Sequence, residues 1–135
     1  MTIRNASTVI EFDAEAVIAA VREAVDAPPF TVVEFDADRY NPLFVSEEGL
    51  ALYRDEEQMA AHFDAIHSFA SIDFNEIDLF TEELFPVAEE VRYITTGLDY
   101  LTLLRIYFDR SGLFLALSPE ETAEPVVEAV VDATE

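Results

Sequence analysis

Residues 91–117 read VRYITTGLDYLTLLRIYFDRSGLFLAL, and this stretch decides the fold. It contains three runs with the composition of β-strands, joined by short turns. Gly97 marks the first turn, and Asp109-Arg110-Ser111-Gly112 marks the second. We therefore expect three consecutive antiparallel strands, at Val91–Thr95, Tyr100–Phe108 and Leu113–Leu117.

The second and third of these strands are apolar on both faces. Within Tyr100–Phe108, Leu104 and Ile106 lie on one face, whereas Leu103 and Tyr107 lie on the other. Strands of this kind must be covered on both faces. We expect one long central helix on one side of the sheet and the first and last helices on the other. Four side chains of these strands should then be almost fully buried: Leu104, Ile106, Phe114 and Leu115.

The remaining elements follow from helical spacing, caps and turn residues. A helix is expected after the N-cap Asp13, strands at Phe30–Phe35 and Leu43–Ser46, a second helix from Asp55, a less regular helical segment at Phe69–Phe85, and a last helix from near Thr122. The order is α-β-β-α-β-β-β-α, which predicts an α+β fold with a five-stranded, mostly antiparallel sheet and helices on both faces. We expect a single domain over 1–135, with residues 1–12 poorly ordered or extended.

Three parts of the chain resemble the Roadblock/LC7 fold: the hairpin Phe30–Ser46, the long middle helix, and the run Val91-Arg92-Tyr93-Ile94-Thr95-Thr96-Gly97 through Leu117. The resemblance covers about Asp13 to Ala133. The chain also resembles a family of small uncharacterised haloarchaeal proteins with a comparable carboxy-terminal strand run. The Roadblock/LC7 resemblance implies a non-enzymatic scaffold that dimerises and often works beside small GTPases.

The net charge indicates the salt concentration in which the protein works. The formal net charge is −22, from 29 acidic residues and seven arginines, and the chain has no lysine. In dilute salt the many carboxylates of such a protein repel one another. Molar salt shortens the Debye length to about 3 Å and screens most of this repulsion. We interpret this composition as that of a cytoplasmic protein of a halophilic archaeon. A mesophilic acidic protein, or an acidic tail that binds a basic partner, is the alternative.

The same composition limits the partners. Seven scattered arginines cannot form a basic stripe, so direct binding to nucleic acid is not expected. No apolar run approaches the roughly 20 residues of a membrane span, so membrane insertion is not expected either. The chain has no cysteine and three glycines, which excludes thiolate chemistry and glycine-rich phosphate loops.

No residue pattern indicates a catalytic, cofactor or metal site. His62 and His67 stand five residues apart, so they do not converge on a helix as an i, i+4 metal pair would. Asp36, Asp38 and Glu47 occupy positions 1, 3 and 12 of a calcium loop, but Asn41 replaces its glycine. We interpret the histidines as structural or solvent-facing and the acidic loop as a plain turn.

Two features admit a functional interpretation. Residues 69–85 carry more apolar side chains than one helical stripe can bury, which predicts either a core or a dimer surface. The interface candidates are Phe69, Phe74, Leu79, Phe80, Leu84 and Phe85, with Phe74 and Phe80 favoured. Arg92 and Arg105 lie on expected strands and either pair with neighbouring acids or hold a small anion.

The sequence thus favours a homodimeric, non-enzymatic interaction, scaffold or regulatory domain, with a small GTPase or another cytoplasmic protein as a further partner and no cofactor. The alternative is a sensor module that binds a small anion near Arg92 or Arg105. A hydrolytic enzyme ranks third, because no carboxylate is singled out. A cavity between helix and sheet with converging polar groups would favour the sensor, and an exposed Phe patch or an open sheet edge would favour the scaffold.

Overall fold

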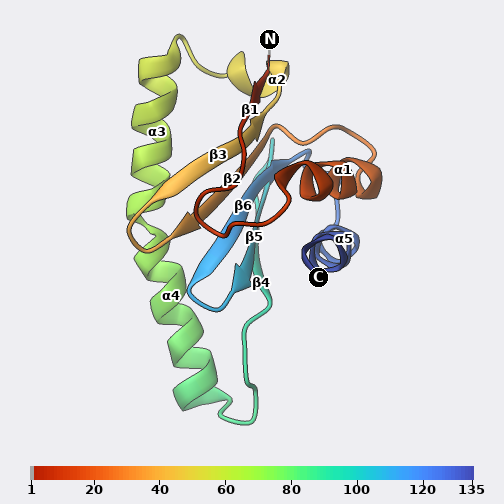
Figure 1. The fold of residues 1–135 in the computed structure, drawn as a ribbon. Coiled ribbons are helices and arrows are strands. Elements are labelled where there is room, and N and C mark those ends of the chain that lie inside the picture. The colour runs from red at the N-terminus through yellow and green to blue at the C-terminus, as the bar shows by residue number, and fades with distance from the viewer. Residues whose placement is uncertain (1) are drawn as a thin grey trace.

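A computed structural model describes residues 2–135 as three layers with a β-sheet in the middle (Figure 1). All neighbouring strands of the sheet are antiparallel. Their order is β1 (Ile3–Arg4), β3 (Tyr40–Val45), β2 (Thr31–Asp36), β6 (Ser111–Leu117), β5 (Thr102–Phe108) and β4 (Tyr93–Gly97). Helices α1 (Ala14–Ala24) and α5 (Ala123–Thr134) cover one face, and a column formed by α3 (Glu56–Ser68) and α4 (Ala70–Asp78) covers the other. The expected α+β fold with helices on both faces is confirmed.

Strands β4, β5 and β6 form the run that the sequence predicts. Leu104 of β5 lies between Thr95 of β4 and Leu115 of β6. The β5–β6 turn places Asp109 at φ 61°, in the left-handed region that a tight hairpin turn requires. The Leu98 amide donates to the Leu101 carbonyl and closes the first turn, so β5 begins at Thr102 instead of Tyr100. Strand β4 runs from Tyr93 to Gly97, two residues later than expected.

The sheet has six strands, so the expectation of five is wrong. The sixth is β1, in which Ile3 pairs with Val45 and Arg4 with Phe44. Two residues are too few for a recognisable alternating pattern. Strand β1 exists because the edge of β3 offers unpaired backbone groups to the segment that precedes α1.

Glu34 of β2 is fully buried and holds the segment that follows β1. Its carboxylate accepts hydrogen bonds from the Ser7 hydroxyl at 2.7 Å, the Thr8 amide at 2.6 Å, the Ile10 amide at 2.8 Å and the Asn41 side chain at 2.7 Å. Burial raises the pKa of Glu34, but the hydrogen bonds from Ile10, Asn41, Ser7 and Thr8 outweigh it and lower that pKa from its ordinary value of 4.5. The carboxylate therefore stays ionised inside the protein.

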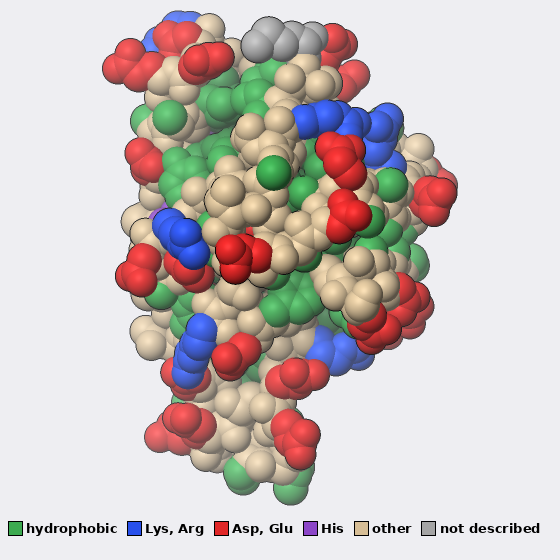
Figure 2. Space-filling model, in the orientation of Figure 1, with side chains coloured by type: hydrophobic (Ala, Val, Ile, Leu, Met, Phe, Trp, Pro, Cys, Tyr) green, Lys and Arg blue, Asp and Glu red, His purple; other side chains and the backbone are tan. Residues whose placement is uncertain are grey.

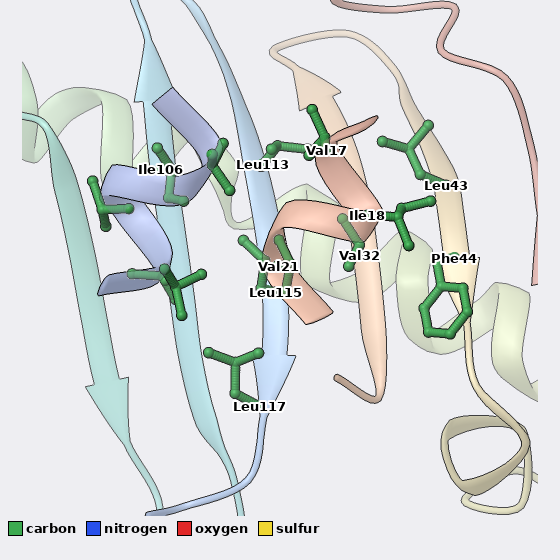
Figure 3. Close-up of a cluster of buried hydrophobic side chains, with 14 of the residues drawn as sticks. Val17, Ile18, Val21, Val32, Leu43, Phe44, Ile106, Leu113, Leu115 and Leu117 are labelled. Atoms are coloured by element: carbon green, nitrogen blue, oxygen red, sulfur yellow. The ribbon is translucent and has the colours of Figure 1, made fainter. Parts of the chain in front are cut away.

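The main core lies between the sheet and the pair α1–α5. Figure 3 shows Val17, Ile18 and Val21 of α1 facing the buried side chains of the sheet. The Asp13 carboxylate accepts a hydrogen bond from the Ala16 amide at 3.1 Å, as expected of the N-cap. Helix α5 begins directly after Thr122, where the sequence places its start.

The helical column on the other face is interrupted rather than continuous. A short helix, α2 (Glu47–Leu50), precedes it, and Asp55 caps α3 through the Gln58 amide at 2.8 Å. Phe69 separates α3 from α4, and a π-helical turn, η1 (Leu79–Leu84), follows α4. Within residues 2–135, no helix is long and apolar enough to span a membrane.

Three of the four expected core residues are confirmed. Leu104, Ile106 and Leu115 are at most 1% exposed. The expectation for Phe114 is wrong, since it is only half-buried. Its side chain faces a cavity beneath the helical column, so one side of the ring lacks a packing partner.

Candidate functional site

Six apolar side chains on α4, η1 and their flanks lie exposed in a single chain. We name them the exposed apolar stripe: Phe69, Ile72, Leu79, Phe80, Leu84 and Phe85. Their exposed fractions range from 36% for Phe80 to 62% for Phe69. Large exposed apolar side chains that gather in one segment of the chain mark candidate interaction sites. Five of the six interface candidates belong to this stripe.

The π-helical turn arranges the end of the stripe. The Phe85 amide donates to the Phe80 carbonyl at 2.7 Å, a bond that spans five residues instead of four. The Thr81 hydroxyl donates to the Ile77 carbonyl at 2.9 Å, which gives that carbonyl a second possible partner within the widened turn. The rings of Phe80 and Phe85 stack with their centroids 6.0 Å apart.

Phe74 is the interface candidate that the structure places in the interior, at 7% exposure. Its ring packs against Phe35, at 6.2 Å between centroids, and against Tyr107, at 5.7 Å. The expectation that Phe74 is exposed is therefore wrong for the single chain. The reason is helical phase: Ala70, Phe74 and Ile77 pack against the sheet, whereas Ile72 of the same helix is 56% exposed.

Strand β4 lies at the edge of the sheet and pairs only with β5 among the described residues. The Tyr107 amide donates to the Arg92 carbonyl at 3.0 Å, and the Leu98 amide donates to the Leu101 carbonyl at 2.8 Å. Even-numbered residues of this edge thus bond to β5, and Tyr93, Thr95 and Gly97 present their backbone groups outward. A groove of about 410 Å³ runs between β4 and η1, lined among others by Ile94, Tyr93, Phe80 and Phe85.

A second hollow lies between the helical column and the sheet. Its volume is about 240 Å³. Most of its wall is aromatic or aliphatic, and five rings contribute to it: Phe35, Tyr40, Phe63, Phe69 and Phe114. Its polar wall is formed by His67, Asp73, Thr96 and Arg105. We call this hollow the helix–sheet cavity.

Arg105 and Asp73 form an ion pair in the wall of the helix–sheet cavity. Arg105 Nε lies 3.0 Å from Asp73 Oδ2, and the two side chains are only 14% and 17% exposed. Arg105 Nη1 also donates to Thr96 Oγ1 at 2.9 Å. Tyr107 donates its hydroxyl hydrogen to the same Asp73 oxygen. Burial, this hydrogen bond and the charge of Asp73 raise the pKa of Tyr107, and Arg105 opposes the shift only in part.

His67 and Tyr40 stand beside each other in the same wall, with ring centroids 5.3 Å apart. His67 Nε2 lies 2.7 Å from the Asp36 carbonyl oxygen. Because a carbonyl can only accept, Nε2 carries the hydrogen. Tyr40 donates to Asp64 Oδ1 at 2.6 Å, and burial together with Asp64 raises the pKa of Tyr40 to about 12.

The structure does not bring Arg92 and Arg105 together into one site. Arg92 is exposed and lies over the ring of Tyr93, 5.7 Å from its centroid. Of the two, Arg105 lines the helix–sheet cavity, and it is paired there with Asp73, the first of its two expected roles. The charge of Arg105 is therefore already compensated.

The other expected sites have structural partners. His62 Nδ1 lies 2.8 Å from the Tyr53 hydroxyl. Asp36 Oδ1 accepts hydrogen bonds from the amides of Asp38 and Arg39, both at 2.9 Å, which closes a turn of the kind expected there. Among residues 2–135, no group of three or more His, Asp or Glu side chains is placed to hold a metal ion.

Sequence reasoning missed Asp73 and Glu34, and it did not place His67 beside a cavity. Glu34 carried a signal, because it is an acidic residue in the middle of β2, on the strand face that also carries Val32. Asp73 falls on the same helical face as Phe74 and Ala70, yet no local pattern distinguishes it from 28 other acids. Its role depends on Arg105, which lies 32 positions away.

Acidic side chains spread over the visible face of the molecule with a few arginines among them (Figure 2). This face shows no continuous basic surface. The scattered charge agrees with the spacing of acids along the sequence.

Comparison with known proteins supports the fold. No family model matches the chain, and neither does any curated protein. Among solved structures, the chain is similar to the crystal structure of a Roadblock/LC7 domain from Streptomyces avermitilis, with a TM-score of 0.54 and 18% sequence identity. The match covers 87% of this chain and 88% of that one. At this identity the likeness concerns the fold, and it confirms the Roadblock/LC7-like architecture.

Proposed function

We propose that the protein is an interaction domain without chemistry of its own, which forms a homodimer through the exposed apolar stripe and the free edge of β4. One observation carries this proposal: part of the stripe lies beside the edge of β4 that faces away from β5. Phe80 and Phe85 of the stripe line the same groove as Tyr93 and Ile94 of β4. Apolar area and backbone hydrogen bonds are thus available on one continuous surface.

A second copy of the chain fits this surface by symmetry. A two-fold interface needs only one self-complementary patch. An edge strand can pair with its own copy in antiparallel orientation, which satisfies the outward backbone groups of Thr95 and its neighbours in both subunits. The exposed stripes then cover each other beside the joined sheets.

The charge of the protein sets the condition under which such a dimer forms. Two subunits that each carry a formal charge of −22 repel one another in dilute salt. Molar salt screens this repulsion and strengthens apolar association. We place the protein in the cytoplasm of a halophilic archaeon on this argument. A small GTPase, carried over from the Roadblock/LC7 resemblance, is the further partner that we propose.

A small-ligand sensor is the second candidate function, and one observation favours it. The helix–sheet cavity has an apolar body and a polar wall that includes Arg105, Asp73 and His67. Pockets with this division of surface are where small ligands bind. The cavity lies within one chain, but Phe69 belongs both to its lining and to the stripe, so a dimer of the proposed kind would cover part of its opening.

Sedimentation equilibrium at micromolar protein in molar KCl tests the leading proposal. The expected result is twice the mass of the 15.2 kDa chain. A strictly monomeric species under these conditions would contradict it, whatever the cavity binds.

A further inference from the structure

We propose that the helix–sheet cavity binds a small, uncharged, planar molecule that has an aromatic body and one group able both to donate and to accept hydrogen bonds. This inference deepens the second candidate function by naming its ligand class. It does not depend on dimerisation.

The size and lining of the cavity define the body of the ligand. The volume of about 240 Å³ is below the roughly 300–1,000 Å³ of sites for drug-sized ligands, so the ligand is small. Aromatic rings favour stacked or edge-to-face contact with another ring. Phe35, Phe63 and Phe114 lie on different sides of the cavity, from the sheet and from α3, and offer such contacts.

The charges in the wall indicate that the ligand is uncharged. Arg105 and Asp73 carry opposite charges whose nearest atoms are 3.0 Å apart, and both side chains are largely buried. A carboxylate or an ammonium group bound beside this pair would lose its hydration, and the wall holds no uncompensated charge to balance it. This balance argues against the anion that the sequence alone suggested for Arg105.

The hydrogen bonds within the cavity wall leave a donor and an acceptor free to bind a ligand. A guanidinium has five N–H groups, and within residues 2–135 those of Arg105 bond through Nε and Nη1, which leaves Nη2 as a donor. Asp73 accepts both of its bonds on Oδ2, which leaves Oδ1 as an acceptor. A neutral His67 adds Nδ1 as a second acceptor, because its Nε2 donates to Asp36.

A primary amide, or a ring with neighbouring N–H and C=O groups, complements this donor and this acceptor.

The cavity is also open to solvent. Phe69, which is 62% exposed, and Thr96, which is exposed, belong to its lining and therefore mark its mouth. In the single chain, a ligand can enter here without unfolding of the helical column.

Three probes of nearly equal size separate the possibilities: benzamide is neutral, benzoate is an anion and benzamidine is a cation. Binding is measured by calorimetry and ligand-observed NMR on the full chain in molar KCl. We expect benzamide to bind at least about tenfold more tightly than either charged probe, because each of these leaves one charge uncompensated.

Cavity-filling variants show whether binding occurs at this place. Ala70→Leu adds a larger side chain to the lining from α4, and Leu103→Phe does so from β5. Both should remove benzamide binding. Ala61→Leu, at an exposed position of α3, is the matched control and should leave it unchanged. A thermal melt of each variant shows whether it folds. Because the two variants lie on different elements, one still tests the site if the other fails to fold.

Each outcome decides a separate point. Tightest binding of benzoate or benzamidine would overturn the uncharged ligand class and leave the sensor function standing. No binding of any probe, or binding that survives both filling variants, would overturn the ligand site and the sensor function together. The dimer proposal is decided by the mass measurement alone.

Discussion

The Ser7 hydroxyl donates a hydrogen bond to Glu34 Oε1 at 2.7 Å, although the two residues are 27 positions apart. Ser7 Oγ also accepts from the amides of Glu11 and Phe12, at 2.8 and 3.2 Å. The serine therefore links the buried carboxylate to the residues just before α1. Glu11 stands at φ 65° within this turn, a conformation that the surrounding hydrogen bonds hold in place.

Replacing this carboxylate should destabilise the protein. Glu34→Gln keeps the size of the side chain but removes the charge, and its NH2 group presents donors to the amide of either Thr8 or Ile10. We expect a loss of about 1–3 kcal/mol in the free energy of unfolding, measured by denaturant titration in molar KCl. Glu23→Gln, at an exposed position of α1, is the control and should change little.

The effect of Glu34→Gln should also depend on pH. The folded protein lowers the pKa of Glu34, so its contribution to stability is present above 4.5 and disappears as pH falls through the folded pKa. The difference in stability between the two proteins should therefore shrink in acid. A difference that stays constant from neutral pH down to the acid transition would contradict this account.

Tyr107 should resist ionisation in the folded protein. Its pKa is raised above the ordinary value of 10.0, so its contribution to stability is complete below that value and is lost as pH rises through the folded pKa. In a titration of tyrosinate absorbance, wild type and Tyr107→Phe should coincide while both stay folded. A smaller amplitude for the variant before unfolding would show that Tyr107 ionises normally.

Salt should control folding. We expect cooperative unfolding transitions at molar KCl and marked loss of structure below a few tenths molar, because screening of the −22 charge weakens as the Debye length grows. Circular dichroism melts across a KCl series measure this. A melting temperature that stays the same from low to high salt would rule out the halophilic interpretation.

A charge placed in the exposed apolar stripe should dissociate the proposed dimer. Phe85→Asp puts a carboxylate where the partner subunit's stripe would lie, so the mass in molar KCl should fall to that of one chain. Leu52→Asp is the matched control. Leu52 is similarly exposed, at 57% against 56%, but lies between α2 and α3 at the other end of the column. Equal masses for the two variants would exclude the stripe from the interface.

The edge of β4 can be tested separately with proline, which has no amide hydrogen. The Thr95 amide faces away from β5, so Thr95→Pro should keep the fold and weaken the dimer. Thr96→Pro is the counterpart, because it removes an amide that bonds to β5 and should lower the stability of the chain. A fully dimeric Thr95→Pro protein would show that the interface uses the stripe without the strand.

Local pattern determined much of the fold. The two apolar faces expected of Tyr100–Phe108 required cover on both sides, and this cover is found for Thr102–Phe108, whereas Tyr100 is exposed. The N-cap at Asp13 and the start of α5 after Thr122 follow from residues within one turn of each site, so they were predictable. The acidic composition, which determines the charge, needs no structure at all.

Only the tertiary structure decided the role of side chains whose contacts come from distant parts of the sequence. Phe74 and Phe80 look alike in the sequence, but the phase of α4 buries Phe74 against Phe35 and leaves Phe80 on the surface. Asp73 gains its role from Arg105, and Glu34 gains its donors from a segment that precedes α1. These contacts join residues more than twenty positions apart, and a hydrophobic period records only which face of an element is apolar, not which polar group it meets.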